Sequence, residues 1–286
     1  MSAPSTFQTL RGKVAIVTGA SRGLGRTNHG DEGRGVQIVA AHTSDSSTAG
    51  IDALKAEIAS LGGDPGTRCV GVKADLRRRD GAAEIVSRAV AAFGPRVDVL
   101  VNNAAAELVK PTAELTPEDF AHVYELNVLA PLLLVQQVMP YLPSCPSPSP
   151  EGEGEDGGSR GGEEGVGAAG GGRIINIASV GARQGLADLS LYCSSKAALE
   201  GLTRCWAEEL GGSGHTVNCV NPGPVHSRML DQIPRAIKER QRAATPAGRR
   251  FGTVGDVAGV VAWLAGEDSR WVTGQCISAS GGYAMY

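Results

Sequence analysis

The sequence has few cysteines, no long apolar run and no excess of either charge, and each of these absences excludes a class of protein. Its six cysteines are scattered without a Cys-x-x-Cys pair. We therefore expect neither a zinc site nor a disulfide framework, but a protein of a reducing compartment. No apolar stretch approaches the ~20 residues that cross a bilayer, and the first residues lack the basic and apolar regions of a signal peptide. We expect a cytoplasmic protein with no membrane partner.

The charged residues nearly balance. With 27 basic and 30 acidic residues the formal net charge is −3, so nothing indicates a nucleic acid or an anionic membrane as a partner. The length of 286 residues fits one large α/β domain or two small ones, and 42% hydrophobic residues are enough for a core.

Short apolar, β-branched runs alternate with stretches in which apolar residues recur every three or four positions. The runs predict strands over residues 14–17, 36–41, 69–72, 97–101, 173–178, 217–220 and 276–278. The helical stretches between them carry start signals, with Asp80 as one candidate N-cap and Thr116 before Pro117 as another. This alternation predicts a parallel sheet covered on both faces. The fold class is α/β: a single doubly wound, Rossmann-like domain with a seven-stranded parallel sheet, spanning residues 1–286.

Two segments depart from this alternation. Residues 143–172 are of low complexity, with Ser/Pro repeats followed by Glu/Gly repeats, so we expect an insertion that forms a disordered surface loop. Residues 26–35 hold three glycines and no aliphatic residue, and they cannot form a convincing amphipathic helix where the chain returns from the first strand to the second. This segment is either a natural divergence or a gene-model artefact.

A glycine-rich loop, Thr-Gly-Ala-Ser-Arg-Gly-Leu-Gly over residues 18–25, directly follows the first predicted strand. Glycines let backbone N–H groups approach a pyrophosphate, and a helix N-terminus behind them favours its charge. NAD-binding proteins usually carry an acidic residue after the second strand, but here Ser44 precedes the first carboxylate, Asp45. Arg22 lies where a cation could meet a 2′-phosphate. We therefore expect NADP(H) rather than NAD as the cofactor.

Tyr192 and Lys196 are four residues apart, which is one helical turn, so the phenol and the ammonium share a face of the helix. A free tyrosine has a pKa of about 10, and a nearby cation lowers that pKa. A tyrosine with a lowered pKa suits general acid catalysis of carbonyl reduction. The pair alone occurs by chance on many surface helices, so the assignment depends on the rest of the chain.

Several motifs, in the right order, resemble those of the short-chain dehydrogenase/reductase family, and the resemblance covers residues 12–283 apart from the two departures. The matching segments are the TGxxxGxG loop at 18–25, Asp75 with Leu76, Asn-Asn-Ala-Ala at 102–105, Asn127, Ser179 placed 13 residues before Tyr192, and Asn-Pro-Gly-Pro-Val at 221–225. Two positions depart from the family pattern: Ala105 stands where the family has glycine, and Ser227 where threonine is commoner. Within the family the chain is most similar to fungal and bacterial 3-oxoacyl-[acyl-carrier-protein] reductases and polyketide ketoreductases.

The resemblance implies a role for each of four catalytic residues. Ser179 would hold the substrate carbonyl oxygen and Tyr192 would protonate it, while NADPH delivers a hydride to the carbonyl carbon. Lys196 would lower the Tyr192 pKa and bind the nicotinamide ribose, and Asn127 would anchor a water in a proton relay. No metal is implied. The implied cofactor contacts are Gly19, Ser21, Arg22, Gly23, Leu24, Gly25, Ser44, Asp75, Leu76, Asn102, Ala104, Tyr192, Lys196, Pro222, Gly223, Val225 and Ser227.

Two functions stay open at this point. The first is an NADPH-dependent reductase of a small-molecule ketone, with the loop over residues 224–248 contacting the substrate as a mobile lid. The second is a catalytically silent cofactor-binding or scaffold protein, because the segment 26–35 would remove the helix behind the phosphate loop.

The resemblance also implies a homotetramer. Trp263, Trp271, Tyr283 and Tyr286 could contribute to one interface, although core packing explains the tryptophans equally well. His42, His122, His215 and His226 are isolated, and we expect them on the surface or in loops.

Overall fold

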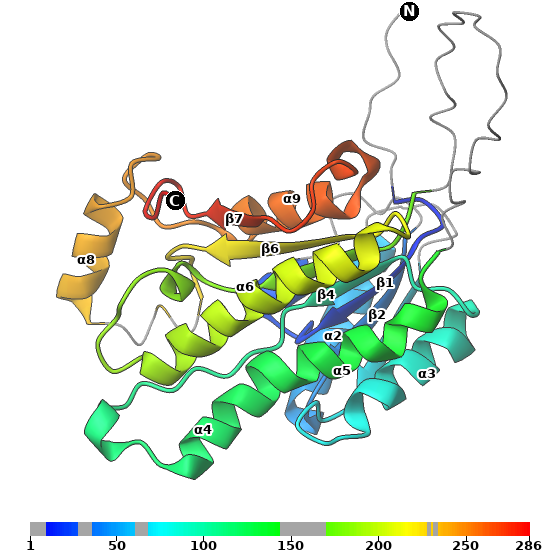
Figure 1. The fold of residues 1–286 in the computed structure, drawn as a ribbon, viewed down its shortest axis with the longest axis horizontal. Helices are drawn as coiled ribbons and strands as arrows, with labels where there is room; N and C mark the ends of the chain where they lie inside the picture. Colours follow the sequence, from blue (N-terminus) through cyan, green and yellow to red (C-terminus); the bar gives the residue numbers. More distant parts are fainter. Residues whose placement is uncertain (1–9, 28–35, 61–67, 144–169, 228–229, 231–233) are drawn as a thin grey trace, which may run out of the picture.

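In a computed structural model of the chain, the structure describes residues 10–27, 36–60, 68–143, 170–227, 230 and 234–286. Seven parallel strands form one sheet in the order β3-β2-β1-β4-β5-β6-β7 (Figure 1). The strands are β1 (Val14–Thr18), β2 (Gln37–His42), β3 (Arg68–Lys73), β4 (Val99–Asn102), β5 (Arg173–Ile177), β6 (Thr216–Pro222) and β7 (Cys276–Ala279). The predicted seven-stranded, doubly wound sheet is confirmed.

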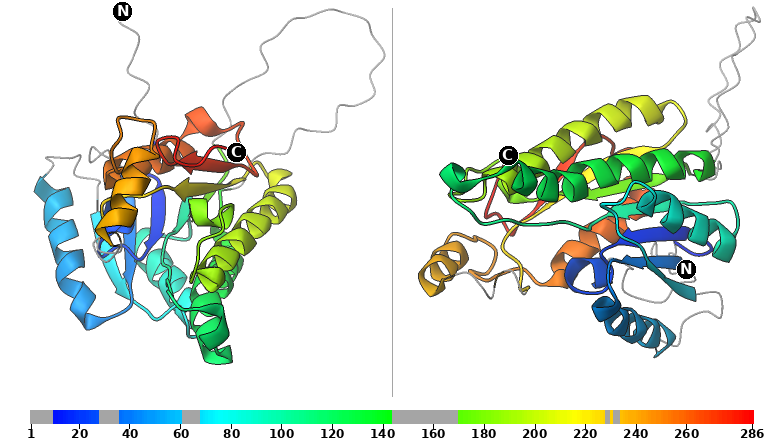
Figure 2. Two further views of the ribbon diagram at one scale, coloured as in Figure 1. Left: turned by 90° about the vertical axis from the view of Figure 1, so that its left-hand side faces the viewer. Right: turned by 90° about the horizontal axis from the view of Figure 1, so that it is seen from below.

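Helices cover both faces of the sheet (Figure 2). On one face α2 (Thr48–Ser60) and α9 (Val254–Ala265) bury apolar side chains against the strands. On the other face the core is closed by α3 (Gly81–Phe93), α5 (Ala130–Val138) and α6 (Ser190–Gly211). The shorter helices are α1 (Gly23–Thr27), α4 (Pro117–Tyr124) and α8 (Arg235–Ala243). No helix in the described part of the chain is long and apolar enough to cross a membrane.

Both predicted helix starts lie where the sequence places them, but only one of them has a side-chain cap. Thr116 accepts a hydrogen bond from the Asp119 N–H at 3.2 Å while the Asp119 carboxylate accepts from the Thr116 N–H at 3.0 Å, a reciprocal capping box ahead of Pro117. Asp80 precedes α3 but makes no capping bond. Its carboxylate instead accepts two hydrogen bonds from the Arg78 guanidinium, at 2.9 and 2.7 Å.

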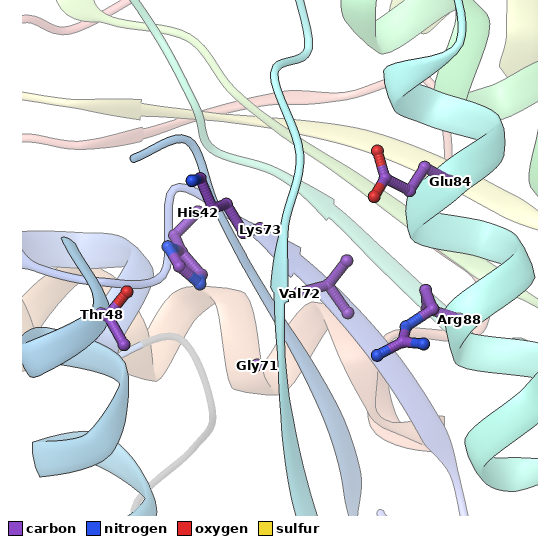
Figure 3. A pocket seen from close by; sticks show the side chains of 7 residues that line it. All are labelled: His42, Thr48, Gly71, Val72, Lys73, Glu84 and Arg88. Atoms are coloured by element: carbon purple, nitrogen blue, oxygen red, sulfur yellow. The ribbon is translucent and has the colours of Figure 1, made fainter. Parts of the chain in front are cut away.

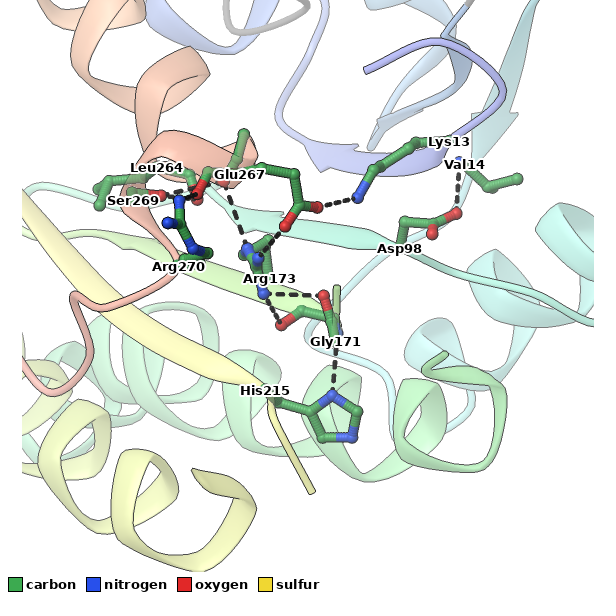
Figure 4. Close-up of polar contacts among 12 residues, drawn as sticks. Lys13, Val14, Asp98, Gly171, Arg173, His215, Leu264, Glu267, Ser269 and Arg270 are labelled. Carbon is green, nitrogen blue, oxygen red and sulfur yellow. Dashed lines mark hydrogen bonds and ion pairs between the residues drawn. The ribbon is translucent and has the colours of Figure 1, made fainter. Parts of the chain in front are cut away.

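A buried arginine joins the amino ends of the strands at the pole opposite the glycine loop (Figure 4). Arg173 is 1% exposed. Its guanidinium donates to the Gly171 carbonyl at 2.8 Å and to the Glu267 carboxylate at 3.1 Å. Glu267 also accepts from Lys13 Nζ at 2.7 Å. A buried cation is tolerated only with such partners.

The same pole corrects the predicted end of the low-complexity segment. The C-terminal end of the low-complexity segment is part of the fold, because Gly171 and Gly172 are buried and the Gly172 N–H donates to His215 Nδ1 at 2.8 Å. His215 lies in the loop before β6, as expected, but it is buried; His42 is the last residue of β2 and 7% exposed, so the expected surface or loop position is wrong for His42. Residues 144–169 lie outside the described residues, so the prediction of disorder there stays a prediction.

The second departure, residues 26–35, lies mostly outside the described residues. The helix α1 ends at Thr27, and residues 28–35 are not described. The sheet face next to it is nevertheless closed, because Leu10 and Val36 join α2 and α9 in one apolar cluster. The cavity left among these side chains measures about 20 Å³.

The two tryptophans assigned to either an interface or the core do not lie in the core. Trp271 is 96% exposed and Trp263 41% exposed, and the C-terminal Tyr286 is 49% exposed. The buried tryptophan is Trp206 on α6.

Candidate active site

The motif residues converge at the carboxyl edge of the sheet, where β1 and β4 are neighbours. The chain winds from β1 towards β3 on one side and from β4 towards β7 on the other, so this edge is the topological switch point. The Thr18 hydroxyl accepts hydrogen bonds from the backbone N–H groups of Asn103 and Ala104, both at 3.0 Å. The Asn103 amide donates to the Thr18 carbonyl at 2.8 Å. The loops after β1 and β4 therefore form one rigid unit.

The glycine loop has the backbone that a phosphate-binding loop requires. Gly19 and Gly23 adopt φ values of +66° and +56°, which side chains other than glycine rarely adopt. A Cβ on Gly25 would collide with the Gly19 carbonyl, whereas a Cβ on Gly23 would meet nothing within 4 Å. The cradle is thus closely packed behind Gly25 and open at Gly23, which fits the approach of a dinucleotide pyrophosphate to the start of α1. Ser21, Arg22 and Leu24 lie in this loop.

The residues predicted for the adenosine end follow β2 and β3. Asp75 accepts from the Arg77 N–H at 3.0 Å, and Leu76 is 6% exposed. Ser44 follows β2 and shares hydrogen bonds with the hydroxyls of Ser46 and Ser47 at 2.8 and 3.1 Å. Asn102 and Ala104 lie at the end of β4.

A pocket of about 510 Å³ borders β3, between the first turn of α2 and α3 (Figure 3). His42 and Lys73 approach it from the ends of β2 and β3, and Arg88 from α3. The other lining residues are Thr48, Gly71, Val72 and Glu84. None of the four proposed catalytic residues lines this pocket, so it is separate from the predicted reacting centre.

Ser179, Tyr192 and Lys196 meet between the end of β5 and the first turns of α6. The Ser179 hydroxyl accepts from the Gly181 N–H at 3.1 Å and interacts with the Tyr192 phenol. Lys196, 2% exposed, donates from Nζ to the Ile177 carbonyl at 2.7 Å. Its Nζ lies 5.8 Å from the centroid of the Tyr192 ring. The structure therefore brings together the serine, the phenol and the ammonium that the sequence motifs select.

The pKa of Tyr192 lies in the direction opposite to the prediction. Burial raises the pKa of Tyr192 to about 12, against a smaller lowering by the Ser179 hydroxyl. Burial also lowers the pKa of Lys196 to about 8, which leaves the ammonium largely protonated at neutral pH. Lys196 is not among the causes of the shift: partial burial and the nearby Glu107 and Cys193 raise the pKa, and the Ser179 hydroxyl is the group that lowers it.

Asn127 occupies a π-helical turn, η3 (Glu125–Leu129), between α4 and α5, and it is 1% exposed. Its side-chain oxygen accepts from the Ala106 N–H at 2.8 Å, and its amide donates to the Ala106 carbonyl and the Ser195 hydroxyl, both at 2.9 Å. Ser195 in turn donates to the Tyr192 carbonyl at 2.7 Å. Asn127 thus connects the loop after β4 to the helical turn that carries Tyr192. π turns are frequent at functional sites.

The loop after β6 carries the remaining residues that the sequence motifs select. Gly223 packs so closely on Ser280 that a Cβ there would lie 2.7 Å from the serine Cβ. Val225 is 9% exposed, and the Ser227 hydroxyl accepts from the Leu230 N–H at 3.3 Å. Pro222 is the last residue of β6.

Glu107 is a residue of the site that the sequence motifs did not identify. It is partly buried, its pKa is raised by burial, and its charge raises the pKa values of both Tyr192 and Cys193. The two hydrogen bonds between the Asn127 side chain and the Ala106 backbone fix the chain just before Glu107. A hydrogen bond from the Lys110 N–H to the Asp188 carbonyl, 2.7 Å long, joins its loop to the one before α6. The signal in the sequence was a carboxylate two residues beyond the Asn-Asn-Ala-Ala motif.

We expect Glu107→Gln to move the alkaline limb of the pH–rate profile of ketone reduction to lower pH. A general acid works only below its own pKa, and removal of the Glu107 charge removes one cause that raises the pKa of Tyr192. The rate would then begin to fall at a lower pH than in the parent protein. Glu114→Gln, an exposed change beyond the same loop, is the control. An unchanged profile for Glu107→Gln would show that the two groups do not interact.

These features define a class of protein: a doubly wound α/β domain with a dinucleotide cradle at the switch point and a Ser–Tyr–Lys site beside it. Two family models match the chain. One, described as short chain dehydrogenase, matches residues 13–149. The other, described as enoyl-(acyl carrier protein) reductase, matches residues 164–284.

Similar proteins support the same assignment. FrzI of Cladobotryum sp, a short-chain dehydrogenase/reductase, is 36% identical over 282 residues that cover 96% of each chain. Among solved structures, a blue fluorescent protein from a metagenomic library in complex with NADPH has a TM-score of 0.79 and 34% identity, covering 97% of this chain and 100% of that one. The angucycline C-6 ketoreductase LanV with bound NADP has a TM-score of 0.79 and 30% identity, covering 96% of both. The chain belongs to the short-chain dehydrogenase/reductase family and is an oxidoreductase of that family.

Proposed function

We propose that this protein is an NADPH-dependent reductase that converts a ketone of 3-oxoacyl or polyketide-like type into an alcohol. The observation that carries the proposal is the convergence of Ser179, Tyr192 and Lys196 beside a glycine cradle. Two similar proteins lend support to the ketone as substrate class. LanV is an angucycline ketoreductase, and LugOII catalyses keto-reduction at C1 during lugdunomycin biosynthesis.

When bound, NADPH would supply the hydride that adds to the carbonyl carbon. The residues of this chain would manage the charge that develops on the carbonyl oxygen. The Ser179 hydroxyl donates a hydrogen bond to that oxygen, and Tyr192 transfers its proton to it. The high pKa of the phenol keeps it protonated before the reaction. Lys196 places a positive charge near the phenolate that the transfer leaves behind, and the Asn127–Ser195 chain fixes the helical turn on which the phenol is carried.

The preference for NADPH over NADH is supported by the charges at the ends of β2 and β3. The first carboxylate after β2, Asp45, accepts a hydrogen bond from Lys73 Nζ at 2.7 Å, and that bond lowers its pKa. A carboxylate already paired with an ammonium repels a 2′-phosphate less than a free one does. Arg22 is exposed on the glycine loop, and Lys73 and Arg88 line the pocket beside β3, so cations are available near this end of the site.

We expect Arg22→Ala to weaken NADPH binding by about 10- to 100-fold and to leave NADH binding unchanged, because a charge-assisted hydrogen bond to phosphate is worth about 1.5–3 kcal/mol. Thermal-shift titrations with each cofactor measure both affinities, since ligand binding raises the stability of the native state. Arg204→Ala, exposed on α6, is the matched control. Equal weakening of NADPH and NADH would contradict the role of Arg22.

The alternative is a catalytically silent member of the fold. The same titration separates the two: a folded protein whose melting temperature responds to neither cofactor would favour the silent protein. The packed cradle at Gly25 and the assembled Ser–Tyr–Lys site support the enzyme.

A homotetramer remains part of the proposal, and the exposed Trp271 and Tyr286 near the C-terminal strand support an interface there. Sedimentation equilibrium would show the homotetramer as four times the chain mass.

The loop that begins after β6 is proposed to contact the substrate, and α8 within it presents an exposed Ile237.

A further inference from the structure

Two cysteines that the proposed reaction does not use are direct neighbours on adjacent strands. Cys219 on β6 and Cys276 on β7 are register partners in the parallel ladder. Register partners point to the same face of a sheet, here the face covered by α6, where Val217 belongs to the same apolar cluster as Trp206. Adjacent strands are about 4.8 Å apart, and disulfides form between Cα atoms separated by about 4.4–6.8 Å. The backbone geometry therefore permits a bond between the two sulfur atoms.

The two thiols differ in access and in surroundings. Cys219 is fully buried, whereas Cys276, at the start of the edge strand, is partly exposed. The Cys219 thiol donates to Asn221 Oδ1 at 3.5 Å and also lies within reach of the Cys276 sulfur, with which Arg183 interacts as well. Arg183 is held in place by Glu200 at 2.8 Å and by the Tyr286 ring, whose centroid lies 4.6 Å away.

The charges around the pair favour a thiolate at Cys276 and a thiol at Cys219. The hydrogen bond from Cys219, together with Arg183, lowers the pKa of Cys276, although burial and the Glu200 carboxylate oppose this. Burial raises the pKa of Cys219. Elsewhere among the described cysteines, burial raises the pKa values of Cys69 and Cys193. Thiolates beside arginine that are open to solvent are the reactive ones.

We propose that Cys276 and Cys219 form a peroxide-reactive dithiol, in which Cys276 is the attacking and Cys219 the resolving cysteine. The Cys276 thiolate attacks one oxygen of a hydroperoxide, the O–O bond breaks, and Cys276 sulfenic acid and a hydroxide or alkoxide ion are formed. The Cys219 thiol then attacks the sulfenic sulfur, its proton leaves with the hydroxyl group as water, and a Cys219–Cys276 disulfide remains. Two electrons pass from the two thiols to the peroxide. This proposal is independent of the proposed ketone reduction.

The test is to treat the native full-length protein, in the assembly in which it purifies, with hydrogen peroxide and then to block remaining thiols with iodoacetamide. We expect peptide mass spectrometry to find residues 219 and 276 in one linked peptide pair, and a reductant to release it. In the Cys219→Ser variant the oxidation should stop at a sulfenic acid on Cys276, which a 1,3-diketone reagent traps. Cys276→Ser should leave Cys219 reduced.

A matched control and two outcomes make the test decisive. Cys205→Ser removes an exposed cysteine on α6 and should leave the yield of the linked pair unchanged. Arg183→Met should slow trapping at Cys276 about tenfold, with circular dichroism confirming that the variant is folded. Full alkylation of both residues 219 and 276 after peroxide treatment would overturn the proposal. So would a native assembly in which Cys276 cannot be alkylated at all.

Discussion

Tyr192→Phe is expected to lower the rate of ketone reduction by about 10²–10⁴-fold, the usual contribution of a positioned general acid. The change removes only the hydroxyl that interacts with Ser179 and leaves the ring, which is packed beside Lys196, in place. NADPH binding should fall much less than the rate, because the glycine cradle and Lys196 remain. The measurement is NADPH oxidation with a ketone that the parent protein reduces, together with a thermal-shift titration of the variant.

The control for this experiment is Tyr124→Phe. The Tyr124 hydroxyl also bonds to α6, where it donates to the Ser194 hydroxyl at 2.9 Å, but the proposed reaction assigns it no role. We expect Tyr124→Phe to keep the parent rate. A Tyr192→Phe protein with the parent rate would refute the assignment of the proton donor, and equal losses in both variants would indicate a general disturbance of α6.

Arg173→Met is expected to lower the free energy of unfolding by about 3 kcal/mol, since it removes the guanidinium that donates to the buried Gly171 carbonyl and neutralises part of the Glu267 charge. The affected groups are the Gly171 carbonyl and the Glu267 carboxylate, and Glu267 keeps only part of its neutralising charge through Lys13. Urea unfolding should show a lower midpoint with an unchanged slope. The activity at low temperature should be retained, because this pole lies at the end of the sheet away from Tyr192.

Arg78→Met is the comparison, because Arg78 also makes two hydrogen bonds to a carboxylate but does so at the surface. The Arg78 and Asp80 side chains are 69% and 63% exposed. Exposed pairs of this kind contribute little, so we expect the unfolding midpoint of the parent protein. An Arg173→Met protein with that same midpoint would show that the buried network is no more stabilising than the exposed one.

The strands could be predicted from the sequence, but their carboxyl ends could not. The structure extends β1, β2 and β4 beyond the predicted apolar runs to Thr18, His42 and Asn102. These side chains are polar yet buried, at 1%, 7% and 3% exposure. A hydrophobicity pattern ends a strand at such polar residues. In the fold Thr18 and His42 hydrogen-bond to the loops that follow the strands, and Asn102 bonds to Asn176 on β5.

The membership of the site could be predicted from motifs, but its electrostatics could not. Local spacing places Lys196 one turn from Tyr192 and says nothing about how far the phenol is buried. The loop that carries Glu107 is fixed by long-range bonds, such as the one between Lys110 and Asp188. The rise in the pKa of Tyr192 follows from burial and from Glu107, which are properties of the tertiary structure.

The π turn at Asn127 has a consequence for the length of the chain. A π turn holds one residue more than an α turn, so it accommodates an extra residue without rotating the helix that follows. Deletion of one residue between Glu125 and Leu129 would therefore leave an ordinary α turn and keep Leu134 and Val138, which are 1% and 0% exposed, in the core. What such a deletion would change is the bulge that presents Asn127 to Ala106 and Ser195, so natural variants of the protein that keep Asn127 should also keep the residue count of this turn.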